Sequence, residues 1–356
     1  MNDIVGNAIA YLRKRAGFTQ KDLAERIGIS DKAVSKWERG VSLPDIGYLR
    51  KLSILLDTDT DSLLAGDVVH HDSSWYGVIV LDDNSYGIGA ETIIYDKPLV
   101  YFLISYFLLV GIKDILIVGS MKDKHFIEKN LGDGTAYGIK LTTFVGSLAE
   151  AGCLKKGITG NIMMVYGRCL LYGVDQTRFF QKAMINRERF TMLVLPKKIG
   201  KYGNRLSIDQ DKKVIDSNSD ESLRTQYDFS EIPIVFFPAS MLDNVAEAEN
   251  IKEYIEEYIT KNDMYVQVLD RGFVDIEIDN WDNVQEASTF IKIIQDRCGM
   301  IVYCLEEVAW RRGMITLEQL KKFEEKYKGT EYGKYISSLY ERVETHNQIV
   351  DYRLIL

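Results

Sequence analysis

The first 66 residues form a series of short apolar stripes at helical spacing, each closed by a turn residue. Thr19 and Ser30 precede two of these stripes, and each can cap a helix because a carboxylate follows near the first turn. Gly28 and Gly40 fall where helices should end. No strand-like run interrupts the series, so the segment is predicted to be an all-α domain of five short helices.

From Tyr76 onward the pattern changes to short apolar runs separated by helical or irregular segments. Such alternation is typical of βαβ units and predicts a mostly parallel sheet covered by helices on both faces. From Asn283 to the end, helical periodicity takes over. The predicted strands are YGVIVL, DILIVG, KLTTFV, NIMMVYG, FTMLVLP, IPIVFFP and YVQVLDRGF.

The polar stretch AGDVVHHDSS separates the two patterns and is interpreted as a linker. The predicted organisation is an N-terminal domain, the linker, an α/β domain, and a helical C-terminal segment of that same α/β domain. In residue numbers these parts are 1–66, 67–75, 76–290 and 291–356.

Charge is divided unevenly between these parts. The chain carries 44 Lys and Arg against 52 Asp and Glu, a net charge of −8, which excludes nonspecific polyanion binding by the whole surface. Residues 1–66 alone hold ten basic and nine acidic side chains. Any contact with nucleic acid is therefore expected from a local patch.

The number and spacing of cysteines and histidines bear on the cellular compartment and on metal binding. The 4 Cys and 4 His show neither a CxxC pair nor ligand spacing, which argues for a reducing compartment and against a structural zinc site. The N-terminus does not have the pattern of a secretory signal. The apolar run from Leu99 to Val110 is shorter than the roughly 20 residues of a bilayer span. We expect a buried helix there, and a cytoplasmic protein without a membrane partner.

Residues 19–40 have the form of a helix-turn-helix, in which the second helix enters the major groove of DNA. The segment TQKDLAERIGISDKAVSKWERG predicts a helix over about 20–27, a turn at Gly28, and a second helix over 31–38. A small helical bundle with a solvated charged face is the alternative interpretation.

The segment LRKRAGFTQKDLAERIGIS with KAVSKWERG resembles the Cro/phage-repressor (XRE-type) helix-turn-helix domain over roughly residues 4–66. The resemblance implies double-stranded DNA as a partner, bound by dimers on palindromic half-sites. Asp31 and Ser35 lie outward; Asp31 is awkward beside phosphates, although a carboxylate can accept from cytosine N4. The other residues that the resemblance places against DNA are Gln20, Lys21 and Arg39 for phosphates and Lys32, Ala33 and Lys36 for bases.

Three later passages resemble sugar-1-phosphate nucleotidyltransferases, most closely glucose-1-phosphate thymidylyltransferase. They are YDKPLVYFLISYFLLVGIKDILIVGS, LGDGTAYGIKLTTFV and LEEVAWRRGMITLEQLKKF, and the resemblance covers about residues 76–340. It implies a Rossmann-like mixed sheet with a helical C-terminal segment, and assembly into a homodimer or homotetramer.

The reaction of that family needs glycine amides and an arginine around a triphosphate, a catalytic lysine, and two carboxylates that hold Mg²⁺. Here Asp82 and Asp83 follow the first strand in place of the glycine-rich loop, and the loop arginine and the lysine have no counterpart. Arg168 stands where a metal-binding carboxylate is expected, and a guanidinium cannot coordinate Mg²⁺. No catalytic residue is therefore predicted.

Two further acids complete the candidate ligand site. Glu277 is the remaining candidate for a cation, and Glu150 replaces the amide that should contact the base. For Arg168 two interpretations are open: its guanidinium replaces Mg²⁺ in pairing with a ligand phosphate or carboxylate, or it forms an ion pair with a neighbouring acid. The candidate ligand-binding residues are Arg168, Glu150, Glu277, Asp82 and Asp83.

These observations favour a cytoplasmic transcription regulator. In this hypothesis a degenerate nucleotidyltransferase domain oligomerises the chain and senses a nucleotide or a nucleotide sugar, with no cofactor. The alternative is a bifunctional enzyme, a thymidylyltransferase that requires Mg²⁺ and also binds DNA. In a third hypothesis the large domain only sets the dimer geometry and has no ligand.

Overall fold

The structure is a computed structural model of the chain, which divides into two compact units. One comprises Met1–His70 with Ser337–Leu356, and the other comprises His71–Ile336. The structure describes residues 2–16, 18–56, 58, 60–65, 75–81, 86–151, 158, 160–185, 187–197, 207–208, 214–216, 228–247, 258 and 264–345.

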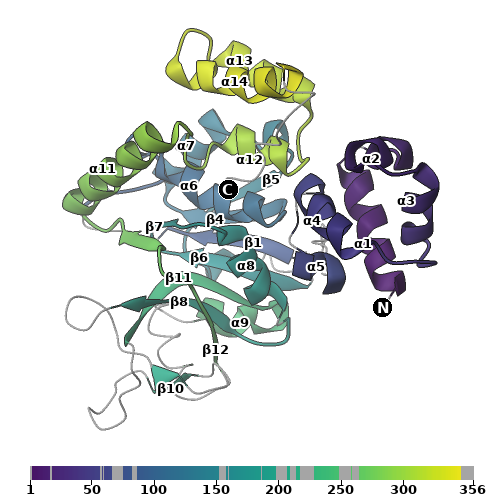
Figure 1. The fold of residues 1–356 in the computed structure, drawn as a ribbon. Coiled ribbons are helices and arrows are strands. Elements are labelled where there is room, and N and C mark those ends of the chain that lie inside the picture. The colour runs from purple at the N-terminus through teal and green to yellow at the C-terminus, as the bar shows by residue number, and fades with distance from the viewer. Residues whose placement is uncertain are drawn as a thin grey trace. The chain divides into compact units, whose positions relative to one another are not determined.

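Five helices make up the described part of residues 2–65, as the sequence predicts (Figure 1). One apolar cluster holds them together, with Leu23, Val34 and Leu52 fully buried. Trp37 joins this cluster from the end of the third helix, with its ring 5.7 Å from that of Tyr48. The helices are α1 (Asn2–Arg15), α2 (Gln20–Ile27), α3 (Asp31–Glu38), α4 (Ile46–Leu55) and α5 (Thr60–Ala65).

Local capping fixes the ends of α2 and α3 where the sequence predicts them. Thr19 and Asp22 form a capping box, and the hydrogen bonds that the Asp22 carboxylate accepts from Thr19 lower the pKa of Asp22. The Ser30 hydroxyl accepts from the Ala33 N–H at 3.3 Å and so caps α3. Gly28 ends α2 with a φ of +79°, a left-handed conformation that favours glycine.

The second unit is built on a seven-stranded mixed sheet of described residues, in the order β12-β8-β11-β6-β1-β4-β5. The pairs β1–β4, β1–β6, β4–β5 and β12–β8 are parallel, whereas β11 is antiparallel to both of its neighbours. The strands are β1 (Trp75–Val80), β4 (Asp114–Gly119), β5 (Lys140–Val145), β6 (Asn161–Tyr166), β8 (Thr191–Lys197), β11 (Asp228–Pro238) and β12 (Tyr265–Val268).

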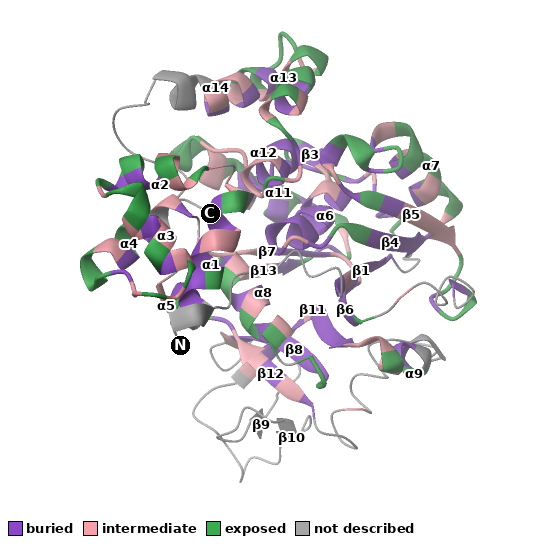
Figure 2. Cartoon of the chain, turned by 90° about the vertical axis from the view of Figure 1, so that its right-hand side faces the viewer, coloured by how far each residue is buried: buried purple, intermediate pink, exposed green. Residues whose placement is uncertain are grey.

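Both faces of the central strands are apolar. Val78 of β1 belongs to a buried cluster that includes Leu242 of α9 on one face. On the other face α6 approaches β1 closely, because a Cβ on Gly77 would lie 2.8 Å from the ring of Phe107. Figure 2 shows β1, β6 and α6 buried over most of their length. The sheet is therefore covered on both sides, as its continuous apolar runs predict.

The apolar segment near residue 100 forms the buried helix α6, as expected. In the part of the chain that the structure describes, no helix has both the length and the apolarity needed to cross a membrane. The other helices of this part of the chain are α7 (Met121–Asn130), α8 (Gln176–Ile185), α9 (Leu242–Glu247), α11 (Trp281–Cys298), α12 (Leu305–Arg311), α13 (Leu317–Lys326) and α14 (Glu331–Thr345), with α6 at Leu99–Leu109.

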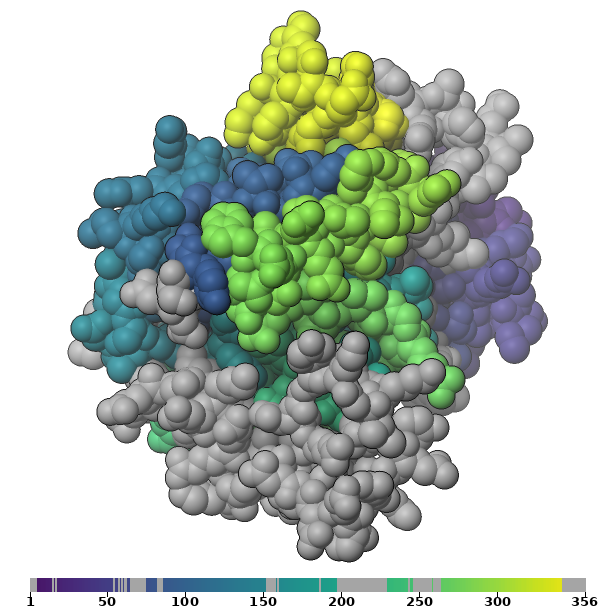
Figure 3. All heavy atoms as spheres, turned by 90° about the vertical axis from the view of Figure 1, so that its left-hand side faces the viewer, coloured from purple at the N-terminus to yellow at the C-terminus, as the bar shows by residue number. Residues whose placement is uncertain are grey.

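The described part of the second unit also contains short strands that the sequence pattern did not predict. The β2–β3 hairpin lies beside α11, where the Tyr95 N–H donates to the Ser288 hydroxyl at 3.0 Å. Figure 3 shows α11 on the surface of the second unit. These strands are β2 (Ile93–Ile94), β3 (Lys97–Pro98), β7 (Cys169–Tyr172), β9 (Ser207–Ile208), β10 (Val214–Asp216) and β13 (Val274–Glu277). The predicted helical residues 346–353 lie outside the described residues.

We predict that Gly6→Ala destabilises the N-terminal domain by about 1–3 kcal/mol or more, because overpacking forces backbone to move. A Cβ at position 6 would lie 2.3 Å from the Trp37 carbonyl oxygen, where α1 and α3 cross. Chemical denaturation measures the loss. Gly47→Ala is the control, since its Cβ would meet only the Asp45 carboxylate at 3.7 Å. Equal stability of the two variants would contradict this account of the crossing.

Candidate nucleic-acid interface and candidate ligand site

The α3 helix places its lysines on the face opposite its buried apolar residues. Val34 and Trp37 are buried, whereas Lys32 and Lys36, and Arg39 directly after the helix, are exposed. Successive helical residues are about 100° apart, which places Lys32 near the centre of the outward face. The other predicted DNA-facing residues of this helix differ in exposure: Asp31 is exposed, while Ala33 and Ser35 are half-buried.

Lys32 and Lys36 follow each other at the i,i+4 spacing on this outward face. Like charges at that spacing destabilise a helix slightly, and within the described residues neither lysine has an acidic partner. Lysines elsewhere are paired at the same spacing, as in Lys21 with Glu25 and Lys292 with Asp296. The α3 face therefore holds two cations available to a polyanion.

A buried ion pair holds α3 against α1. Arg13 donates from Nε to Glu38 Oε1 at 2.5 Å and from Nη2 to Oε2 at 3.0 Å, with side-chain exposures of 10% and 7%. Arg13 also donates from Nη1 to the Phe18 carbonyl oxygen at 2.6 Å. Removing one partner of such a pair costs about 3–5 kcal/mol, because the other charge is left buried. The pair fixes the position of α3 relative to α1.

Gln20 belongs to the same network. Its Nε2 donates to Glu38 Oε2 at 2.7 Å, which ties the first residue of α2 to the last residue of α3. The contact of Gln20 with a phosphate stays a prediction, but this side chain is committed to positioning α3. Lys21 is exposed beside it, with its Nζ 3.9 Å from Glu25. Sequence patterns did not indicate the Arg13–Glu38 pair, because its partners are 25 residues apart.

The candidate ligand site of the second unit lies where the sheet changes direction. β1 has β4 on one side and β6 on the other, so the connections from β1 and β6 leave at a topological switch point. The Gly167 N–H donates to the Val80 carbonyl oxygen at 2.9 Å, which keeps these two carboxyl ends together. Ligands of open α/β sheets bind outside such carboxyl ends.

Arg168 stands two residues past the end of β6, at this edge. Its carbonyl oxygen accepts from the Ile278 N–H at 2.7 Å, and Glu277 pairs with Cys169 across the β7–β13 ladder. The structure thus brings the predicted Arg168 and Glu277 to neighbouring strand ends. Burial raises the pKa of the Cys169 thiol well above its usual value, so this thiol stays neutral. The candidates Asp82 and Asp83 lie outside the described residues.

The described residues at this edge do not fit Mg²⁺. The ion prefers oxygen ligands in octahedral geometry. Of the candidate ligand residues at this edge that the structure describes, Arg168 offers a guanidinium and Glu277 an exposed carboxylate. No group of three or more metal-ligating side chains occurs in the described parts of the chain. An arginine at this position is suited to a phosphate or carboxylate group.

The glycine-containing loop after β1 uses its amides within the protein. The Gly89 N–H donates to the Thr92 hydroxyl at 3.0 Å, and the Ala90 N–H donates to Asp123 Oδ1 at 2.6 Å. The other oxygen of Asp123 accepts from the Ser120 N–H and hydroxyl and closes the capping box of α7. A buried carboxylate of the chain therefore accepts from the Ala90 amide of this loop. The SMKD sequence was a signal for this capping role.

Glu150 has a local role that the sequence prediction missed. Its Oε2 accepts from the Ser147 N–H at 2.8 Å and from the Ser147 hydroxyl at 3.2 Å. The Glu150 N–H donates back to that hydroxyl. These reciprocal bonds form a capping box, for which the spacing of Ser147 and Glu150 was a signal. The carboxylate proposed to contact a base thus stabilises its own turn.

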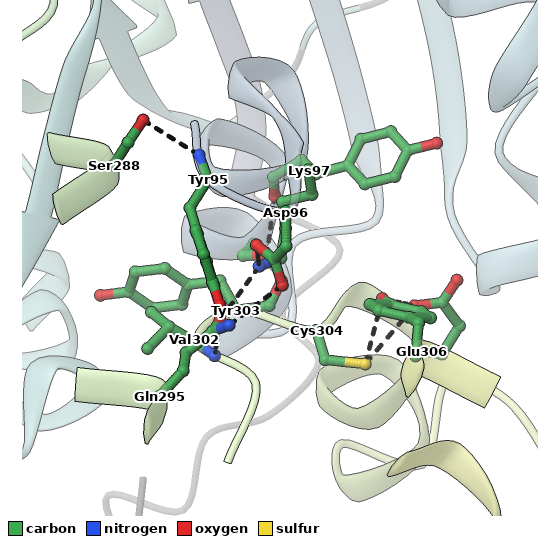
Figure 4. Close-up of polar contacts among 12 residues, drawn as sticks. Tyr95, Asp96, Lys97, Ser288, Gln295, Val302, Tyr303, Cys304 and Glu306 are labelled. Atoms are coloured by element: carbon green, nitrogen blue, oxygen red, sulfur yellow. Dashed lines mark hydrogen bonds and ion pairs between the residues drawn. The ribbon is translucent and has the colours of Figure 1, made fainter. Parts of the chain in front are cut away.

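Lys97 lies in a closed polar cluster beside α6 (Figure 4). Its Nζ is 2.6 Å from Asp96 Oδ1, and Gln295 Nε2 donates to the other Asp96 oxygen at 3.1 Å. Gln295 Oε1 accepts from the Val302 N–H at 2.9 Å. Burial lowers the pKa of Lys97, and the Asp96 carboxylate opposes that shift. The bond between Asp96 and Gln295 joins the β2–β3 hairpin to α11, and Lys97 neutralises the Asp96 carboxylate.

Comparisons with known proteins match two parts of the chain to different proteins. Residues 9–63 match the family model described as helix-turn-helix. The rest is similar to the glucose-1-phosphate thymidylyltransferase of Neisseria gonorrhoeae, 27% identical over 261 residues, which cover 69% of this chain and 90% of the relative. The enzyme of the same name from Xanthomonas campestris pv. campestris is 27% identical over 271 residues, covering 71% and 90%.

A solved structure confirms the fold of the large domain. It is that of a Bacillus anthracis protein assigned as a glucose-1-phosphate thymidylyltransferase, in complex with sucrose. The TM-score is 0.50 at 14% identity, and the match covers 61% of this chain and 94% of that one. Both resemblances inferred from the sequence are confirmed: a helix-turn-helix at the N-terminus, and a nucleotidyltransferase-like α/β fold in the rest.

Proposed function

We propose that this protein is a sequence-specific DNA-binding transcription regulator whose nucleotidyltransferase-like domain is catalytically inactive. In this proposal the large domain oligomerises the chain and senses a nucleotide or a nucleotide sugar in the cytoplasm. The observation that carries the proposal is the outward face of α3. Its two lysines have no acidic partner among the described residues, on a helix that a buried ion pair fixes in place.

Electrostatics support the DNA-binding part. Exposed lysines without acidic partners release counterions when they neutralise phosphates, which favours binding to a duplex. The −8 charge of the chain opposes nonspecific attraction, so affinity must come from this local face. The α3 helix also carries side chains suited to base edges, as the second helix of a helix-turn-helix should.

The chemistry at the β1–β6 edge supports the loss of catalysis. Arg168 stands where a carboxylate should hold a metal ion, and the amides of Gly89 and Ala90 are bonded to Thr92 and Asp123. A triphosphate would have to displace the Asp123 carboxylate to use the same amide. The guanidinium at the switch point supports anion binding that does not depend on a metal.

The alternative function is a thymidylyltransferase that also binds DNA. The 27% identity with enzymes of that name over most of the large domain favours it. This function requires Mg²⁺ and a reaction in which glucose 1-phosphate attacks deoxythymidine triphosphate and pyrophosphate leaves. Turnover above a buffer control would overturn the proposed inactivity and leave the DNA-binding proposal intact.

The double variant Lys32→Ala/Lys36→Ala should lower affinity for the selected operator duplex by about tenfold or more, because each lost base contact costs about 1–3 kcal/mol. Fluorescence anisotropy with labelled DNA measures the change. The control Lys321→Ala/Lys322→Ala removes the same charge from the exposed side of α13. Equal losses in the two double variants would show a general charge effect and contradict a reading role for α3.

The full-length protein should be a homodimer or homotetramer at micromolar concentration. Dimers suit palindromic half-sites, since one short reading helix gives limited affinity alone. Sedimentation equilibrium gives the mass of the assembly directly. A monomer that does not dimerise even on operator DNA would remove the oligomerising role from the large domain.

Thymidine or uridine nucleotides, or their sugar conjugates, should raise the unfolding temperature of the full-length protein equally with and without Mg²⁺. A ligand at 100 times its dissociation constant stabilises the folded state by about 2.7 kcal/mol. The shift should be lost in Arg168→Met and kept in Arg178→Met, which removes an exposed arginine of α8. Absence of any shift would leave the large domain without a sensing role.

A further inference from the structure

Asp31 is the only acidic side chain on the outward face of α3, all of whose residues are described. It is the first residue of the helix and is exposed, whereas the other acid of α3, Glu38, is buried against Arg13. Lys32 and Lys36 lie on the same face. An acid in this position approaches the DNA polyanion together with the lysines. It therefore opposes binding unless a hydrogen-bond donor of the DNA pairs with the carboxylate.

The local structure of α3 gives little reason for an acidic residue at position 31. The Ser30 hydroxyl already caps α3 through the Ala33 N–H. Asp31 Oδ1 accepts from the Lys32 N–H at 2.8 Å, and Oδ2 has no partner within the described residues. An acid in the first helical turn stabilises an exposed helix by only about 0.3–1 kcal/mol through the helix dipole. One carboxylate oxygen is therefore available for an external donor.

The base edges of the major groove offer few partners to a group that only accepts. Guanine presents two acceptors there, and thymine presents an acceptor beside a methyl group. Adenine presents a donor beside the N7 acceptor, which would repel a carboxylate. Cytosine presents the N4 amino donor alone, so a carboxylate is best matched by cytosine.

We propose that Asp31 reads a cytosine in each operator half-site and thereby determines specificity. This inference rests on the proposed DNA-binding function and names one base of the site. The Asp31 carboxylate accepts a hydrogen bond from cytosine N4, while Lys32 and Lys36 supply the attraction to the duplex. At every other base pair the same carboxylate repels acceptors or phosphates, so it weakens binding to wrong sequences.

The test is selection of binding sites from a random pool of duplexes by the full-length protein, followed by affinity measurement. Wild type should enrich a half-site in which one C·G pair cannot be replaced without losing about tenfold or more in affinity. Asp31→Asn should move that preference to adenine, because a carboxamide both accepts and donates and matches N6 and N7. Asp31→Ala should abolish preference at that position alone.

Glu25→Gln is the matched control. It removes one negative charge from an exposed residue of the preceding helix, as Asp31→Asn does for α3. The Glu25→Gln variant should keep the preference for cytosine in the half-site while raising the affinity for all duplexes. Circular dichroism checks that each variant remains folded, as expected for a side chain whose only described bond lies within its own turn.

The outcomes separate the two proposals. Enrichment of no sequence by the wild-type protein would contradict the DNA-binding function itself. Enrichment of the same half-site by wild type, Asp31→Asn and Asp31→Ala would support DNA binding and overturn the role of Asp31. A change confined to one position in the two Asp31 variants, absent from Glu25→Gln, would establish that role.

Discussion

The ion pair of Arg13 and Glu38 is the interaction on which the candidate DNA-reading surface depends. It joins α1 to the end of α3, and its third contact, from Gln20, joins α2 to the same carboxylate. Because the pair is almost fully buried, its charges cannot be exchanged for water at low cost. The close packing of Gly6 against the Trp37 carbonyl oxygen constrains the same crossing of α1 and α3. Together they hold α3 so that its charged face points away from the apolar cluster.

A comparable constraint governs the candidate ligand edge of the large domain. Backbone amides in a loop bind phosphate only when nothing within the protein accepts from them. Asp123 and Thr92 accept from the amides of Ala90 and Gly89, and Asp123 at the same time caps α7. The loop is thereby fixed to the neighbouring β4–α7 turn. The fold of the relatives is kept, with these loop amides bonded within the chain.

Local signals in the sequence were sufficient for much of the fold. The ends of α2 and α3 agree with the predicted helices because Thr19, Ser30 and Gly28 act within a few residues of themselves. The same holds for the buried strands, whose apolar runs are continuous. By contrast β7 and β13 were missed, since each has four residues and gains its stability from a partner about 100 residues away. The antiparallel direction of β11 is likewise a property of its neighbours.

In the candidate sites, too, some features follow from the sequence and others only from the tertiary structure. The sequence by itself determined which side chains are cationic on α3 and that a helix-turn-helix precedes an α/β domain. That Arg168 replaces a metal-binding carboxylate stays a prediction. It also contained the spacing of Ser147 and Glu150, a signal for a capping box that the prediction did not include. Only the tertiary structure decided that Gln20 bonds to Glu38 and that Asp123 occupies the Ala90 amide. The physical reason is that helix ends and exposed faces follow from contacts within one turn. Buried charges and loop amides find partners 18 to 33 residues away, and folding alone brings these together.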